Sequence, residues 1–264
     1  MGRGAGVRRF FMKITLLQTD IKWCSPKENL ARAEELILGA EKSDIYILPE
    51  MFTTGFCMKP TEITEPVGGV AFEWMMQMAK RMDAAIVGSV AVEDGGKYYN
   101  RMYFCKPDGE VEVYDKHHLF SFSGEDKVYT AGVERKVVEF RGVKILLLIC
   151  YDLRFPVFSR NRNDYELIIC VANWPRVRRY PWCTLAKARA IENLCYVAAV
   201  NRGGTDEWGD YSGDTMLIDP YGQPVAECKE GVEDVVTASI DLELITNFRN
   251  KFPALNDADD FILK

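Results

Sequence analysis

Short apolar runs alternate with longer amphipathic segments along this chain. Residues 26–41 and 70–82 place apolar side chains three or four positions apart, which is typical of helices with one buried face. The apolar runs are bounded by turn residues such as the EDGG at positions 93–96, which is typical of strands. We predict strands at residues 13–18, 45–48, 84–92, 98–106, 111–114, 136–140, 144–149, 167–171, 195–200, 215–219 and 235–240.

The order of these elements indicates the class of fold. A helix starting near Pro156 and another ending near Asn193 lie among the later strands, whereas turns alone separate the strands between residues 84 and 114. This mixture of helical crossovers and hairpins predicts an α/β protein in which helices cover one sheet or two. Because no repeat, linker or change of composition divides the chain, we predict one domain over residues 12–264. Residues 1–11 are set apart as an N-terminal extension.

Composition narrows the kind of partner. Of 264 residues, 48% are hydrophobic and 27% are charged, the balance of a globular protein with a sizeable core. The net charge of −6 gives no broad attraction for phosphate backbones, and Arg176, Arg178 and Arg179 form only a small basic group. No apolar run approaches the roughly 20 residues of a membrane span. We expect a small-molecule partner, with no nucleic acid and no membrane.

The cysteines indicate a reducing compartment. None of the eight forms a CxxC pair, which argues against a zinc ribbon or a redox pair. Several lie inside apolar runs, Cys105, Cys170 and Cys195 among them, where a free thiol packs like a small hydrophobic side chain. We therefore expect a cytoplasmic protein.

Cys150 is the candidate nucleophile because it directly follows the apolar run at residues 144–149. The ends of buried α/β strands commonly carry ligands, and the N–H groups of a following helix can favour a thiolate and stabilise an oxyanion. Position alone fits a buried structural cysteine equally well. The nucleophile would also need a base or a nearby cation.

Three side chains compete for that supporting role. His117 and His118 are the only histidines, and they precede the cysteine, the reverse of a papain-like order. This argues against a Cys–His protease, although His118 stays open as a base. Glu50 ends the strand at 45–48 and Lys116 follows the strand at 111–114, where a buried carboxylate and a cation could pair. From position alone both fit surface charges as well.

Three sequence segments together resemble the signature segments of the nitrilase superfamily of carbon–nitrogen hydrolases: LPEMFTTGF at 48–56, YDKHHLF at 114–120 and LICYDLRFP at 148–156. The resemblance implies a four-layer α-β-β-α sandwich and a catalytic set of Glu50, Lys116 and Cys150. It adds Glu125 as a second carboxylate, for which a charge in a solvated turn is the alternative. It requires no metal or organic cofactor. Family members commonly dimerise, and the aromatic, charged tail at 247–264 is consistent with a homodimer.

Further segments are similar to the ω-amidase branch of this superfamily, namely VANWP at 171–175, KARAIEN at 187–193, VNRGG at 200–204 and YSGDTMLIDPYG at 211–222. This similarity implies that Arg154 holds the remote carboxylate of a substrate such as α-ketoglutaramate. Pairing with Asp152 or with a helix end is the alternative role for Arg154.

The same resemblance implies that the backbone N–H of Tyr151 contacts the oxyanion and that Asn173 and Trp174 line the pocket. Trp174 could equally anchor the core. Other activities stay open: a nitrilase, an N-carbamoyl amidohydrolase, or a non-catalytic binding protein on the same fold.

Overall fold

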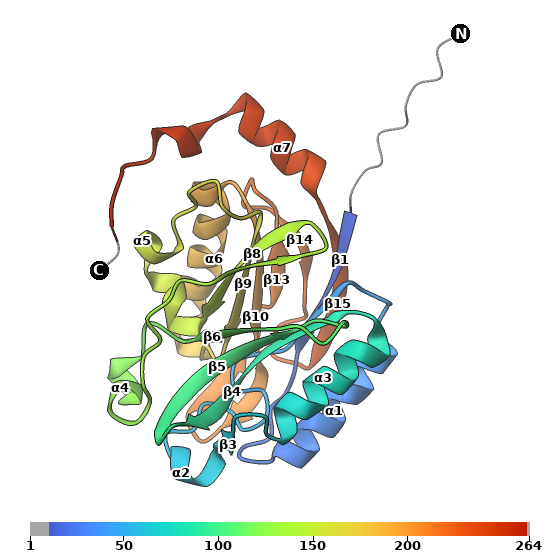
Figure 1. The fold of residues 1–264 in the computed structure, drawn as a ribbon, viewed down its shortest axis with the longest axis vertical. Coiled ribbons are helices and arrows are strands. Elements are labelled where there is room, and N and C mark those ends of the chain that lie inside the picture. The colour runs from blue at the N-terminus through green and yellow to red at the C-terminus, as the bar shows by residue number, and fades with distance from the viewer. Residues whose placement is uncertain (1–10, 263–264) are drawn as a thin grey trace.

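Two mixed β-sheets lie face to face in the computed structural model, which describes residues 11–262 (Figure 1). The predicted extension, apart from Phe11, lies outside the described residues. The first sheet has the order β15 (Asp234–Asp241), β1 (Phe11–Gln18), β2 (Ile45–Ile47), β4 (Ala85–Asp94), β5 (Lys97–Cys105) and β6 (Val111–Asp115), with β3 (Glu65–Pro66) beside β4. The second has the order β14 (Pro224–Glu227), β13 (Met216–Ile218), β10 (Tyr196–Asn201), β9 (Leu167–Ala172), β8 (Val143–Ile149) and β7 (Val137–Phe140).

Helices cover the outer face of each sheet (Figure 1). Helices α1 (Pro26–Gly39) and α3 (Val70–Met82) pack on the first sheet, and α6 (Arg179–Asn193) packs on the second beside α5 (Pro156–Ser159). Short helices α2 (Pro60–Ile63) and α4 (Glu125–Val128) lie in connections. The predicted α-β-β-α sandwich is confirmed.

The alternation of side chains along the strands explains the layers. In β2, Ile45 and Ile47 join the core between the two sheets, whereas Tyr46 joins the core under α1 and α3. All three are fully buried, as expected for a central strand with parallel neighbours on both sides. On α3, Met75 and Ala79 lie one turn apart and both face the sheet, which is the helical spacing the sequence predicts.

Several elements differ from the sequence prediction. The hairpin of β11 (Gly203–Asp206) and β12 (Gly209–Ser212), the edge strand β14 and the helix α7 (Leu242–Lys251) were not predicted. The hairpin is rich in glycine and charge, and β14 is mostly exposed, so neither shows an apolar pattern. Strand β1 begins at Phe11, which pairs with Asp241, one residue before the predicted domain boundary.

The C-terminal tail runs back over its own chain (Figure 1). Arg249 of α7 donates hydrogen bonds to the carbonyl oxygens of Leu194 and Tyr165, at 3.0 and 2.7 Å. Contact of this tail with a second copy stays a prediction. Across residues 11–262, the structure contains no helix with the length and apolar character needed to cross a membrane.

Candidate active site

Three strand ends from both sheets meet at one place. Glu50 follows β2, Lys116 directly follows β6, and Cys150 directly follows β8. The side chains of Glu50, Lys116 and Glu125 are completely buried. Because an isolated buried charge is very costly, these groups are stable only as a mutually paired cluster.

Lys116 lies between two carboxylates. Its Nζ donates to Glu50 Oε1 at 2.8 Å and to the two oxygens of Glu125 at 3.0 and 2.9 Å. Burial alone would lower the pKa of this ammonium, but the charges of Glu125 and Glu50 raise it well above its usual value. Lys116 is therefore a permanent cation in a cluster whose net charge is −1 when both carboxylates are ionised.

Asn100 connects the same two carboxylates. Its Nδ2 donates to Oε1 of Glu50 at 2.8 Å and to Oε1 of Glu125 at 3.3 Å. Ser89 donates to Asn100 Oδ1 at 2.9 Å and accepts from the backbone N–H of Met51 at 2.9 Å, which sets the orientation of the amide. Sequence reasoning missed Asn100, although an asparagine in the middle of an apolar strand is itself a signal.

Backbone donors complete the carboxylates. The N–H of Asn173 donates to Glu50 Oε2 at 2.7 Å, and its side-chain amide donates to the Glu50 carbonyl. The N–H of Phe120 donates to Glu125 Oε2 at 2.6 Å. Burial still raises the pKa of Glu125, since Lys116 only partly offsets it and the charge of Glu50 adds to it. Glu125 is thus a buried cluster member, not a charge in a solvated turn.

Cys150 has a left-handed backbone, with φ of 48°, at the start of a 3-10 turn over Cys150–Arg154. Such a conformation is strained for a residue with a side chain, and it turns the chain sharply at the end of β8. Burial and then the charge of Glu50 raise the pKa of the thiol well above its usual value, with Lys116 opposing them. This direction favours the thiol form of Cys150, so a thiolate favoured by the following turn stays a prediction.

Asp152 anchors the turn that carries Cys150. This buried carboxylate accepts from the N–H of Ile149 at 2.9 Å, from the hydroxyl of Tyr114 at 2.7 Å and from Nδ1 of His118 at 2.8 Å. His118 also stacks on Phe155, with ring centroids 3.7 Å apart, and does not line the cavity at Cys150. The arrangement gives His118 a structural role.

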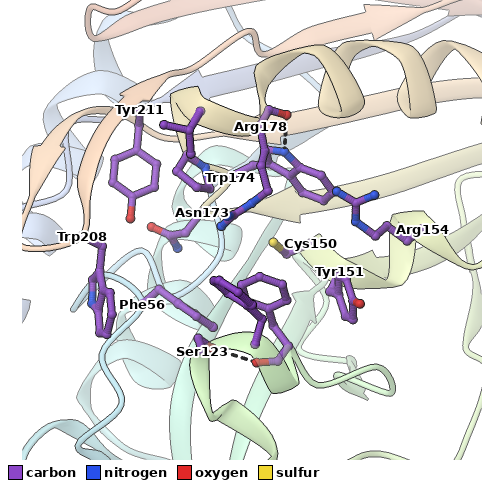
Figure 2. Close-up of a pocket in the computed structure, with 14 residues that line it drawn as sticks. Phe56, Ser123, Cys150, Tyr151, Arg154, Asn173, Trp174, Arg178, Trp208 and Tyr211 are labelled. Carbon is purple, nitrogen blue, oxygen red and sulfur yellow. Dashed lines mark hydrogen bonds between the residues drawn. The ribbon is translucent and has the colours of Figure 1, made fainter.

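A cavity of about 220 Å³ opens above Cys150 (Figure 2). The predicted substrate contacts Tyr151, Arg154, Asn173 and Trp174 all line it. The guanidinium carbon of Arg154 lies 5.1 Å from the centre of the Trp174 ring. Within residues 11–262 Arg154 has no ion-pair partner, so the alternative pairing with Asp152 is wrong. The lining residues are Phe56, Phe120, Phe122, Ser123, Cys150, Tyr151, Arg154, Asn173, Trp174, Pro175, Val177, Arg178, Trp208 and Tyr211.

Two polar features of the lining bear on chemistry. Asn173 lines the cavity, and its buried Oδ1 atom has no hydrogen-bond partner in the described chain. Trp174 is 4% exposed and donates from Nε1 to the Arg178 carbonyl at 2.7 Å. It therefore lines the cavity and is also packed into the core, so both predicted roles apply. No group of three His, Cys, Asp or Glu side chains in residues 11–262 is arranged to hold a metal ion.

Sequence reasoning missed part of the wall. Trp208 and Tyr211 belong to the unpredicted hairpin, and Phe56 ends a segment that was read only for Glu50. Arg178 was noted only as part of a basic group. Arg178 comes four positions after Trp174, which was predicted to line the pocket. This closeness in sequence is the signal that could have placed Arg178 at the cavity.

Comparisons with known proteins agree on one family. The model of the carbon–nitrogen hydrolase family matches residues 13–250. The chain is 44% identical to the omega-amidase YafV of Yersinia enterocolitica, covering 96% of this chain and 98% of that one. It is 37% identical to a 2-oxoglutaramate amidase of Bacillus subtilis, covering 92% and 96%. A CN-hydrolase superfamily protein from Xanthomonas campestris, solved with an arsenic adduct in its active site, superposes with a TM-score of 0.94 at 43% identity, covering 97% and 100%.

Proposed function

Because the chain belongs to the carbon–nitrogen hydrolase family, we propose that it hydrolyses the ω-amide of short dicarboxylic acid monoamides to the acid and ammonia. The observation that carries this proposal is the contact of Glu50, Lys116 and Glu125 beside Cys150. The wall of the same cavity holds Arg154, which has no ion-pair partner within residues 11–262. Relatives named as an omega-amidase and a 2-oxoglutaramate amidase support the same substrate class.

Glu50 is proposed as the general base. The raised pKa of Cys150 keeps sulfur protonated at rest, so the proton must leave as sulfur attacks the amide carbonyl. Glu50 accepts that proton and then gives it to the departing nitrogen, which leaves as ammonia. A thioester to Cys150 remains. Glu50 then takes a proton from a water as the water oxygen attacks the thioester carbonyl, and it gives this proton to the Cys150 sulfur as the C–S bond breaks and the carboxylic acid is released.

Lys116 and the backbone N–H of Tyr151 are proposed to stabilise the oxyanion. Lys116 suits this role because two carboxylates hold it protonated and fixed. Glu125 positions the Lys116 ammonium and the attacking water.

Two wall residues are proposed to select the substrate. Arg154 binds the remote carboxylate, for which a guanidinium fork is well suited. Asn173 accepts an N–H of the substrate carboxamide at its unpartnered Oδ1. A nitrile has no such hydrogen, so this contact favours amides. Trp174 holds Arg154 in position through its ring face.

The test is ammonia release from α-ketoglutaramate by the wild type and by Cys150→Ala. We expect steady release by the wild type and a loss of several orders of magnitude in the variant. Equal rates would contradict the assignment of the nucleophile. A panel of nitriles and N-carbamoyl compounds tests the other activities, and the absence of turnover or Cys150 adduct with every compound would favour a binding protein.

We further propose a cytoplasmic homodimer. All eight cysteines are free, which supports a reducing compartment. Apolar side chains such as Ile191 of α6 and Phe252 after α7 are 52% and 56% exposed and would be covered by a second copy. Sedimentation analysis tests this proposal, and a monomer at micromolar concentration would contradict it.

A further inference from the structure

Two arginines in the cavity differ from the others in residues 11–262. Within that range, the guanidinium groups of Arg154 and Arg178 make no hydrogen bond or ion pair, and both line the cavity at Cys150. The remaining guanidinium groups each donate to a carboxylate or a backbone carbonyl; they belong to Arg32, Arg81, Arg101, Arg135, Arg141, Arg160, Arg162, Arg176, Arg179, Arg189, Arg202 and Arg249.

Aromatic rings hold both guanidinium groups without using their N–H donors. Arg154 lies 5.1 Å from the centre of the Trp174 ring, and Arg178 lies 5.1 Å from that of Phe120. Trp174 also donates to the Arg178 carbonyl, so one side chain fixes the positions of both arginines. A guanidinium on a ring face keeps its N–H groups at its edge, where they can reach an acceptor.

Among residues 11–262, no Asp or Glu lines the cavity, so its wall offers these two cations no counter-charge from the described part of the chain. In an inference that rests on the proposed function, we propose that Arg178 is a second carboxylate-binding residue, which holds the free carboxylate of the substrate together with Arg154. In Figure 2 Arg154 reaches the cavity from the right and Arg178 from above.

The chemistry of a carboxylate fits two guanidinium groups. Its two oxygens offer about four lone-pair sites, enough for N–H donors from both arginines. An anion between them also relieves the repulsion of two unpaired cations. The substrate class is therefore ω-amides that carry a free carboxylate, in preference to neutral amides of the same length.

The experiment compares succinamate with its neutral methyl ester as substrates, by ammonia release. Arg178→Gln is expected to lower kcat/KM for succinamate about 10- to 100-fold, mainly through KM, because one charged hydrogen-bonding partner is lost. The value for the ester should change little. Arg176→Gln is the matched control, since Arg176 lies two residues away and pairs with Glu230 outside the cavity.

Two outcomes would overturn the role of Arg178. An equal loss of kcat/KM on both substrates would mean that Arg178 only supports the aromatic wall at Phe120. An unchanged kcat/KM for succinamate would mean that Arg178 does not contact the carboxylate. Wild-type enzyme that releases no ammonia from either compound would instead count against the proposed function. Calorimetry of succinamate with Cys150→Ala, with and without Arg178→Gln, then tests Arg178 without turnover, and equal affinities would refute the proposal.

Discussion

At the scale of single residues, the burial of an ammonium between two carboxylates dominates the candidate site. Each charge is stable only because the others are present, so the cluster acts as a unit. Removing one member leaves uncompensated charge in a place that water does not reach. Effects on activity and on stability should therefore appear together.

Lys116→Met tests this coupling. Without the cation, the pKa of the Glu125 carboxyl group, which burial already raises, should rise further above the unfolded value of about 4.3. A raised carboxyl pKa costs stability above the unfolded pKa, so the loss should be small near pH 4 and reach about 3–5 kcal/mol by pH 8. Urea unfolding at both pH values measures it. Lys144→Met, at an exposed position of β8, is the control, and a loss independent of pH would contradict the coupling.

Asn100 is expected to act through the carboxylates it connects. Asn100→Leu removes an N–H donor that favours the charged forms, so the acid limb of the pH profile of kcat/KM should move to higher pH by about one unit. Ser89→Ala, which removes the donor to Asn100 Oδ1, should move it in the same direction by less. A lower rate with an unmoved profile would leave Asn100 with a packing role alone.

Residue identities were predictable where local sequence carried them. Glu50, Lys116 and Cys150 stand in recognisable segments, so they could be named before their geometry was known. Asn100 and Arg178 could not, because their significance depends on which atoms they meet across the sheet and across the cavity. The raised pKa of Cys150 was equally inaccessible, since it follows from burial.

At the scale of elements, the β11–β12 hairpin is the part of the wall that hydrophobic pattern could not reveal. It is held by the fully buried Arg202, which pairs with Asp206 at 2.6 Å and donates to the Ile21 carbonyl at 2.9 Å. The same guanidinium lies 4.4 Å from the centre of the Tyr211 ring. The buried Arg202 guanidinium thus holds this hairpin in place, whereas apolar side chains hold the other strands.

Arg202→Met should detach the hairpin from its anchor. We expect a loss of about 3–5 kcal/mol in unfolding free energy, because Asp206 is left buried without its cation. The KM should rise as well, since Trp208 and Tyr211 line the cavity. The double variant Arg202→Met/Asp206→Leu should lose less stability than the single one in urea unfolding. A double variant at least as unstable as the single one would argue against the ion pair as the anchor.

At the scale of the whole molecule, alternating patterns predicted most of the two sheets and the helices α1, α3 and α6. Strands such as β2 and β8 are buried on both faces, and their apolar runs are correspondingly continuous. The order of strands within a sheet could not be read from the pattern, because β1 lies between β2 and β15, which is distant in sequence. Pairing between strands so far apart in sequence produces no local sequence pattern.

The distribution of thiols offers a test of the whole fold. In native protein near pH 7, five buried cysteines should resist a thiol reagent. Cys24 is exposed as a residue but should react slowly, because partial burial of its sulfur and the neighbouring Cys57 raise its pKa to about 12. All eight should react in denaturant. Mass spectrometry after timed labelling identifies the sites, and early modification of the buried set would contradict the packing. That set is Cys57, Cys105, Cys170, Cys195 and Cys228.

The charge around Lys116 also governs how a catalytic cycle ends. Turnover would convert a neutral amide at the floor of the cavity into an anion beside Glu50. That anion meets two carboxylates and only one ammonium, a net negative charge, so it is repelled from the position that its precursor occupied. The dicarboxylic acid should therefore leave readily and inhibit weakly, and the enzyme would keep working while its product accumulates.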